Sequence, residues 1–135
     1  MLRFKYLFLL FLLLSLTACN TLQSRSKPNV LQRTLSEYEA VIRWGILNNA
    51  YSFLRPDMAA ETYPKNARFK NIRVTGYDVI VKPSNLSEDL VRQIAWIRYV
   101  HVDQQIVREI NDEQLWEYDE AENKWWRSNP IPEFK

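Results

Sequence analysis

The chain has 135 residues, with 18 Lys and Arg against 16 Asp and Glu, one His and one Cys. A chain of this length fits one domain with one core, and a single cysteine cannot form an internal disulfide. Arg3 and Lys5 lie in a leader that we expect to be removed, which leaves 16 basic residues to balance the 16 acidic ones. This balance argues against a nucleic-acid-binding protein, which would be strongly basic.

The first predicted element is a signal peptide over residues 1–18. Arg3 and Lys5 precede an apolar run, Tyr6–Leu16, and small residues up to Ala18 close the segment. A charged start, an apolar middle and a small-residue end are the order of a secretory leader. An uncleaved transmembrane anchor is the weaker alternative, because a membrane-spanning helix needs about 20 apolar residues.

The four residues Leu16-Thr17-Ala18-Cys19 resemble the lipobox of bacterial lipoproteins. The resemblance implies cleavage between Ala18 and Cys19 and a diacylglyceryl group on the Cys19 thiol. Two acyl chains hold a protein stably at a membrane, whereas one chain would be marginal. Asn20 stands where an Asp would imply retention at the inner membrane. The expected location is therefore the outer membrane, facing the periplasm, with the inner membrane as the alternative. An ordinary signal peptide with a chance cysteine also stays open.

Residues 19–33 are predicted to be the lipidated cysteine and a flexible tether, since no apolar period runs through them. Residues 34–135 are predicted to form a single domain. Ser36 and Glu39 have the spacing of a helix capping box, and Thr34 with Glu37 offers the same signal two residues earlier. We therefore expect the first helix to begin near these residues.

Two short helical segments follow. The first stripe of apolar residues recurs at three- and four-residue spacing through Leu35, Tyr38 and Ile42. Gly45 is expected to interrupt the helix, and a second helix is predicted over Ile46–Leu54. Arg55-Pro56 should end it, because the residue before a proline avoids helical angles.

From Phe69 the apolar period changes to two, which predicts four antiparallel strands. A parity switch at Gly76 predicts a β-bulge in the first strand. The other strands are predicted over Val91–Val102, Ile106–Tyr118 and Lys124–Ser128. Helices followed by strands imply an α+β fold, with two N-terminal helices packed on a curved four-stranded antiparallel sheet.

The segments YEAVIRWGILNNAYSFLRPD, RVTGYDVIV and LWEYDEAENKWW resemble a group of uncharacterised proteobacterial lipoproteins. That group is similar to the nuclear transport factor 2-like (cystatin-like) fold. The resemblance implies a cone-like domain whose interior, in enzymes of the superfamily, holds an Asp, Tyr or His. It implies no particular reaction.

The candidate pocket residues are aromatic, with one histidine. His101 and Asp103 are an acid/base candidate, but residues two apart on a strand lie about 6.5 to 7 Å apart, so a polar strand end is the simpler interpretation. A ligand pocket is predicted from Trp44, Tyr51, Trp96, Tyr99 and His101. Such aromatic residues are more often core.

Two surface features are candidates for interaction. The first is a basic cluster formed by Lys65, Arg68, Lys70 and Arg73. It could meet an anionic partner or be a solvated face. The second is the pair Trp125 and Trp126, which must point to opposite sides of a strand. One of them should therefore lie outside the core, at a dimer or partner surface.

The sequence shows no metal-ligand spacing, phosphate-binding loop or serine nucleophile motif, so we expect neither a metal nor a cofactor. The predicted function is a membrane-anchored envelope lipoprotein whose domain acts as a non-catalytic interaction or structural module. It would bind the membrane through its lipid and a second copy or an envelope protein through its surface. The alternative is a domain that binds a small apolar ligand, or acts on one as an isomerase or dehydratase.

Overall fold

The computed structural model describes residues 26–62 and 69–135, so the predicted signal peptide, residues 1–18, and Cys19 lie outside the described residues. Three helical elements come first: α3 (Lys27–Trp44), the 3₁₀ helix η1 (Leu47–Phe53) and α4 (Pro56–Thr62). Four strands follow: β1 (Ile72–Asn85), β2 (Leu90–His101), β3 (Val107–Asp119) and β4 (Lys124–Arg127). The prediction of an α+β fold with helices before an antiparallel sheet is confirmed.

Helix α3 begins at Lys27, so the prediction of a flexible tether over residues 19–33 is wrong from Lys27 onward. The expected start near Thr34 and Ser36 lies inside the helix. Pro28 is in the first turn, where its fixed φ suits a helix start. The buried stripe of the helix is Val30, Thr34, Leu35, Tyr38 and Ile42. Val30 adds a turn to this stripe. Its burial stabilises the helical conformation in a segment whose composition suggested a linker.

The 3₁₀ helix η1 packs against α3. η1 falls within the predicted segment Ile46–Leu54 but has 3₁₀ geometry. Its residues Leu47, Ala50 and Tyr51 are buried, together with Leu54 after it. Leu54 bridges Arg127 in β4, which fixes the helical segment to the edge of the sheet.

The sheet has the order β1-β2-β3-β4, and each strand pairs with the next in antiparallel fashion. The bulge predicted at Gly76 is confirmed by a register shift between Val74 and Gly76. A Cβ on Gly76 would lie 2.6 Å from Nη2 of Arg98, so the glycine leaves room for this guanidinium. Further register shifts before Ser84 add twist to the same strand.

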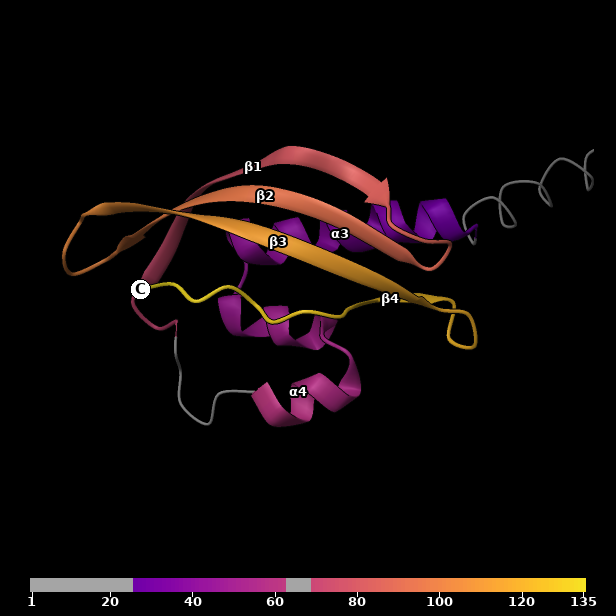
Figure 1. Ribbon diagram of the computed structural model, residues 1–135. Coiled ribbons are helices and arrows are strands. Elements are labelled where there is room, and N and C mark those ends of the chain that lie inside the picture. Colours follow the sequence, from indigo (N-terminus) through magenta and orange to yellow (C-terminus); the bar gives the residue numbers. More distant parts are fainter. Residues whose placement is uncertain (1–25, 63–68) are drawn as a thin grey trace, which may run out of the picture.

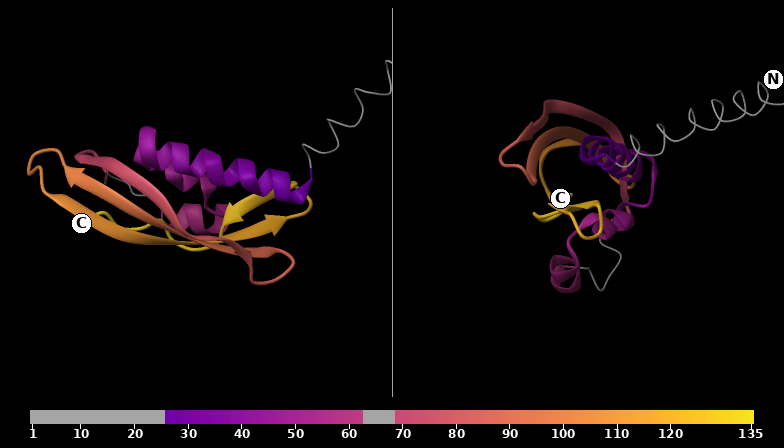
Figure 2. Two further views of the ribbon diagram at one scale, coloured as in Figure 1. Left: turned by 90° about the horizontal axis from the view of Figure 1, so that it is seen from above. Right: turned by 90° about the vertical axis from the view of Figure 1, so that its right-hand side faces the viewer.

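The strands form one curved layer, with α3 along its inner face and η1 and α4 beside it (Figure 1). Figure 2, in its end view, shows the sheet curling around α3 and the last residues of the chain. Tyr38 of α3 is fully buried in this concavity, and its ring meets Phe53 and Trp116 edge to face at 5.4 Å each. The core therefore lies between α3 and the inner side chains of the strands.

The chain after β4, residues 128–135, returns across the open side of the sheet without pairing as a strand. Pro130 and Pro132 lack the N–H that a ladder needs. Ile131 and Phe134 are buried, and the Phe134 ring lies 5.0 Å from the Tyr99 ring. The Tyr99 hydroxyl also donates to the main-chain oxygen of Lys135 at 2.7 Å. This segment, the C-terminal strap, is part of the core.

Candidate functional site

An arginine–carboxylate pair lies at the centre of the domain. Arg127 of β4 donates from Nη2 to Oδ1 of Asp112 at 2.6 Å and from Nη1 to Oδ2 at 3.1 Å. Each side chain is 1% exposed. β3 and β4 pair so that Trp116 faces Arg127, which places Asp112 and Arg127 on the inner side of the sheet. A buried ion pair needs further hydrogen bonds to offset the loss of water.

These hydrogen bonds come from α3 and the neighbouring strands. Tyr38 donates to Oδ2 of Asp112 at 3.1 Å, and Gln114 donates to the same oxygen at 2.9 Å. Gln114 Nε2 also donates to the Tyr77 hydroxyl at 2.8 Å. Gln93 donates to Gln114 Oε1 at 3.2 Å, so the polar cluster continues into β2. The Asp112 carboxylate is thus engaged on both oxygens.

The other donors of Arg127 go to the Tyr38 hydroxyl, at 2.5 Å from Nη1, and to main-chain oxygens. Nε donates to Asn129 at 3.1 Å, and Nη2 donates to Pro130 at 2.8 Å. The C-terminal strap therefore covers the guanidinium as well as filling the core. Burial by itself would lower the pKa of Arg127, but the facing oxygens of Tyr38 and Asp112 outweigh it and raise the pKa, so the guanidinium stays charged.

The two tyrosines of the cluster are held neutral. Burial raises the pKa of Tyr38 well above its ordinary value, against the opposing effect of Arg127. Burial also raises the pKa of Tyr77. A carboxylate that already accepts from three side chains, beside tyrosines that resist ionisation, is arranged for structure rather than for accepting a proton from a substrate.

The acid/base candidate His101 has a different position. It is half-buried at the end of β2, and its ring centroid lies 6.1 Å from that of Tyr99. Gln104 and Gln105 both donate their N–H groups to its main-chain oxygen, which makes the predicted turn. Within residues 69–135 the structure shows no hydrogen bond or ion pair between His101 and Asp103. The candidate acid/base pair is therefore not assembled, which agrees with the simpler interpretation of His101 as a polar residue at a strand end.

The five predicted pocket residues do not line a common cavity. Trp44 is 78% exposed at the end of α3. Trp96 points to the outer face of the sheet, because its neighbours Ala95 and Ile97 are the fully buried residues of β2. The structure does bring Tyr51, Tyr99 and His101 to one end of the core.

Phenylalanine rings link these residues. Tyr51 stacks on Phe69 at 6.1 Å, and Phe69 meets Phe134 at 5.4 Å. A cavity of about 190 Å³ lies beside this row, lined by Tyr51, Phe69 and residues 131–135. The strap thus forms most of the lining of this cavity.

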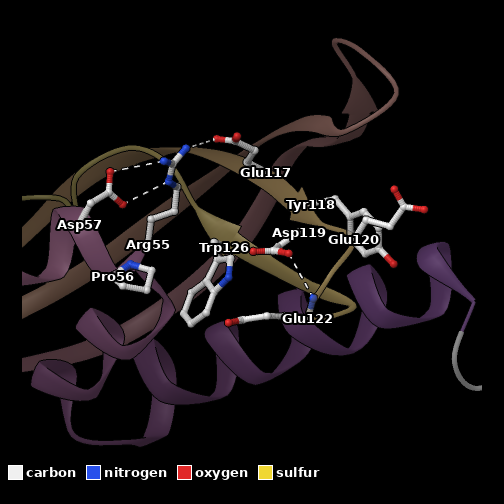
Figure 3. A pocket seen from close by; sticks show the side chains of 9 residues that line it. All are labelled: Arg55, Pro56, Asp57, Glu117, Tyr118, Asp119, Glu120, Glu122 and Trp126. Carbon is white, nitrogen blue, oxygen red and sulfur yellow. Dashed lines mark hydrogen bonds and ion pairs between the residues drawn. The ribbon is translucent and has the colours of Figure 1, made fainter.

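An open groove of about 620 Å³ lies where the start of α4 faces the β3–β4 hairpin (Figure 3). We call it the acidic groove; its lining is Arg55, Pro56, Asp57, Glu117, Tyr118, Asp119, Glu120, Glu122 and Trp126. Five of these residues carry carboxylates and only one carries a positive charge. The groove would attract a cationic group or a basic segment.

Arg55 holds two of these carboxylates at one end of the groove. Nη1 lies 2.7 Å from Oε2 of Glu117, and Nε lies 3.2 Å from Oδ1 of Asp57. Hydrogen bonds to Glu117 and Asp57 raise the pKa of Arg55. Desolvation would raise the pKa of Asp57, but Arg55 outweighs it and holds that pKa below its ordinary value.

The two adjacent tryptophans of β4 separate as predicted. Trp125 is 2% exposed and packs in the core, where its indole donates to the main-chain oxygen of Lys27 at 3.2 Å. Trp126 is half-buried on the other side, with Lys124 Nζ 3.4 Å from its ring centroid. Of the two, Trp126 is therefore the residue available to a partner.

The predicted basic cluster is only partly described. Lys65 and Arg68 lie outside the described residues, whereas Lys70 and Arg73 are exposed near the start of β1. Both line open grooves beside the end of α3.

Sequence reasoning missed the buried pair. Asp112 and Gln114 fall within the predicted strand Ile106–Tyr118, but neither was a candidate for a buried site. Their parity matches that of Trp116, which is the available signal that they point inward. Arg127 follows two tryptophans, and nothing local distinguishes it from a surface residue at a strand end.

Scans against family models, curated proteins and solved structures each gave no match for this chain. Residues 26–62 and 69–135 contain no helix with the length and apolar character to cross a bilayer. In the same residues no three His, Cys, Asp or Glu side chains gather closely enough to hold a metal ion.

Proposed function

We propose that this protein is an envelope lipoprotein, anchored through Cys19 and facing the periplasm from the outer membrane, with the inner membrane as the alternative. Its domain is an interaction module related to the nuclear transport factor 2-like fold. The anchor is supported by the sequence Leu16-Thr17-Ala18-Cys19. The relationship is supported by the curved antiparallel sheet, which curls around α3 (Figure 2).

The contrast between interior and surface carries the proposal of a module. The interior carboxylate, Asp112, is 1% exposed and fully engaged with Arg127, so a substrate would find no free base there. The open space lies outside, in the acidic groove beside Trp126. A half-buried aromatic ring among charges is a common anchor for a protein partner.

Replacement of Cys19 by Ser tests the anchor. The lipid-modifying step needs the thiol, so the variant should stay uncleaved and should incorporate no labelled palmitate. The measurement is the mass of the purified chain together with its label. Normal processing of Cys19→Ser would mean an ordinary signal peptide and would refute the anchor.

A photo-reactive amino acid at position 126 tests the module in intact cells. We expect a discrete cross-linked product, either a second copy or one envelope protein, that disappears when Glu120 and Glu122 are changed to Lys. The same probe at Glu88, in the exposed β1–β2 turn, is the matched control. Equal products from both positions, or no effect of the charge reversal, would contradict a specific contact at the acidic groove.

A small apolar ligand is the second candidate, because a cavity of about 190 Å³ adjoins Phe134. Native mass spectrometry of the protein from cells would show extra mass that is lost on denaturation. A mass equal to that of the protein alone would exclude a bound ligand and leave the interaction module as the proposed function.

A further inference from the structure

Two large apolar side chains project from the end of α3 into solvent. Trp44 is 78% exposed and Ile46 is 69% exposed, on either side of Gly45. A Cβ at Gly45 would lie 2.9 Å from the main-chain oxygen of Val41, so the chain turns off the helix where only a glycine fits. Isolated exposed apolar residues are ordinary, but a tryptophan this exposed beside an exposed isoleucine indicates a contact surface.

Trp44 is held in place rather than left loose. The Arg43 guanidinium lies 3.9 Å from the Trp44 ring centroid, which is a close cation–π contact. Arg43 Nη1 also donates to the main-chain oxygen of Val74 in β1 at 2.9 Å. The exposed ring is therefore tied through one arginine to the edge of the sheet.

The surface around these residues is basic. Two open grooves of about 280 and 290 Å³ adjoin here and share Gly45, Leu47 and Ile72. Among the residues that the structure describes, Arg43, Lys70 and Arg73 line them, and no acidic residue does. We call this region, with Trp44 and Ile46, the helix-end surface. It has the composition that membrane interfaces favour, since indole rings lie at the headgroup level and Lys and Arg pair with anionic lipids.

The length of the chain before α3 makes a membrane accessible to this surface. α3 has 18 residues, which corresponds to a helix of about 27 Å. The segment from Asn20 to Ser26, when fully extended, spans at most about 24 Å. In a chain anchored at Cys19, the start of α3 can therefore lie almost one helix length from the leaflet while the Trp44 end approaches the lipid. The anchor also raises the local concentration of lipid, so that a weak second contact becomes effective.

The opposite end of α3 has the opposite charge. Lys27 contacts the Tyr118 ring at 4.6 Å from its centroid, so the acidic groove lies at the start of the helix. Anionic headgroups would repel this groove and attract the helix-end surface. Electrostatics thus favours a tilt that brings Trp44 toward the lipid.

We propose that the helix-end surface contacts the anionic phospholipid headgroups of the leaflet that holds the Cys19 acyl chains. This contact rests on the proposed lipid anchor. It gives the domain a fixed orientation on the membrane and leaves the acidic groove facing away from the lipid.

The test uses the full chain purified from cells and reconstituted into vesicles of phosphatidylethanolamine and phosphatidylglycerol with brominated acyl chains. Bromine quenches tryptophan only at close range. We expect quenching that is lost in Trp44→Phe, which keeps an apolar ring, and retained in Trp126→Phe. The double variant Lys70→Glu/Arg73→Glu should lose about half or more of the quenching at physiological salt. It should approach the level seen with phosphatidylcholine alone.

Flotation and intact mass separate the two proposals. A chain that carries acyl groups and floats with the vesicles, but whose Trp44 is not quenched, overturns the lipid contact while the anchor stands. An acidic protein surface would then be the better occupant. A chain without acyl groups refutes the anchor, and the contact with it. Equal quenching in Trp44→Phe and the wild type would place another tryptophan at the lipid and would also overturn the proposal.

Discussion

Two arginine–carboxylate pairs of the domain have nearly the same closest distance but different surroundings. Arg127 and Asp112 approach to 2.6 Å, with both side chains 1% exposed. Arg55 and Glu117 approach to 2.7 Å, with the side chains 39% and 44% exposed. The distances alone would suggest that the two ion pairs contribute equally to stability. The surroundings predict a large difference, because water screens the second pair and is absent from the first.

The largest expected effect comes from removing one partner of the buried pair. Arg127→Ala leaves Asp112 charged and unpaired in the core, and we expect the free energy of unfolding to fall by about 3 to 5 kcal/mol. Arg55→Ala, in the acidic groove, should cost about 0 to 1 kcal/mol. Urea denaturation of both variants measures the difference. Similar losses would show that burial does not distinguish the two pairs.

A double replacement sharpens the comparison. Arg127→Met with Asp112→Leu removes both charges and fills a similar volume, so it should be clearly more stable than Arg127→Ala alone. A double variant as unstable as the single one would mean that the surrounding hydrogen bonds, rather than the unpaired charge, dominate the loss.

The next effect comes from the strap that covers Arg127. Phe134→Ala removes a buried ring that packs on Tyr99 and Phe69, and we expect a loss of about 3 kcal/mol. Glu133→Ala, on the exposed neighbour, is the control and should change stability by about 0.5 kcal/mol or less. Thermal unfolding measures both. A neutral Phe134→Ala would mean that the strap merely lies on the domain.

Raising the pH should lower the stability contributed by the interior before it affects the acidic groove. The pKa of Tyr38 is raised in the fold, so below about pH 10 the tyrosine is neutral in both folded and unfolded chains. Above that pH the unfolded chain releases the proton first, and stability falls by roughly 1.4 kcal/mol per pH unit for each such group. Unfolding at stepped pH should show this slope, reduced in Tyr38→Phe. An unchanged slope in that variant would contradict the assignment.

The smallest effect is expected at the groove in acid. The pKa of Asp57 is lowered in the fold, so its contribution is present above its ordinary value of about 3.8 and is lost as the pH falls through the folded value. The free energy of unfolding of the wild type should therefore be slightly higher than that of Asp57→Asn at neutral pH, and the two values should converge in acid. A stability difference between the two proteins that grows as the pH falls would contradict the lowered pKa of Asp57.

The sequence predicted the types of the elements better than the boundaries or the interior. Alternating apolar residues and turn residues located the strands and the bulge at Gly76. The start of α3 was missed because the polar residues around Pro28 conceal one buried turn at Val30.

The buried pair was beyond local reasoning. Asp112 and Arg127 meet only because β3 and β4 pair in one register, with Trp116 opposite Arg127. The same holds for Tyr38, which reaches the pair from α3. Composition shows which residues carry charges, but the long-range pairing of strands decides which of these side chains are buried and paired with an opposite charge.

The strap also constrains the order in which the chain can mature. Ile131 and Phe134, near the last residues, complete a core whose first member is Val30. A ribosome releases the chain from its N-terminal end, so the earlier residues emerge before the groups that close their core are free. Until then α3 and the sheet lack part of their packing, and Arg127 lacks its main-chain acceptors at Asn129 and Pro130. The domain therefore completes its packing only after the strap has left the ribosome.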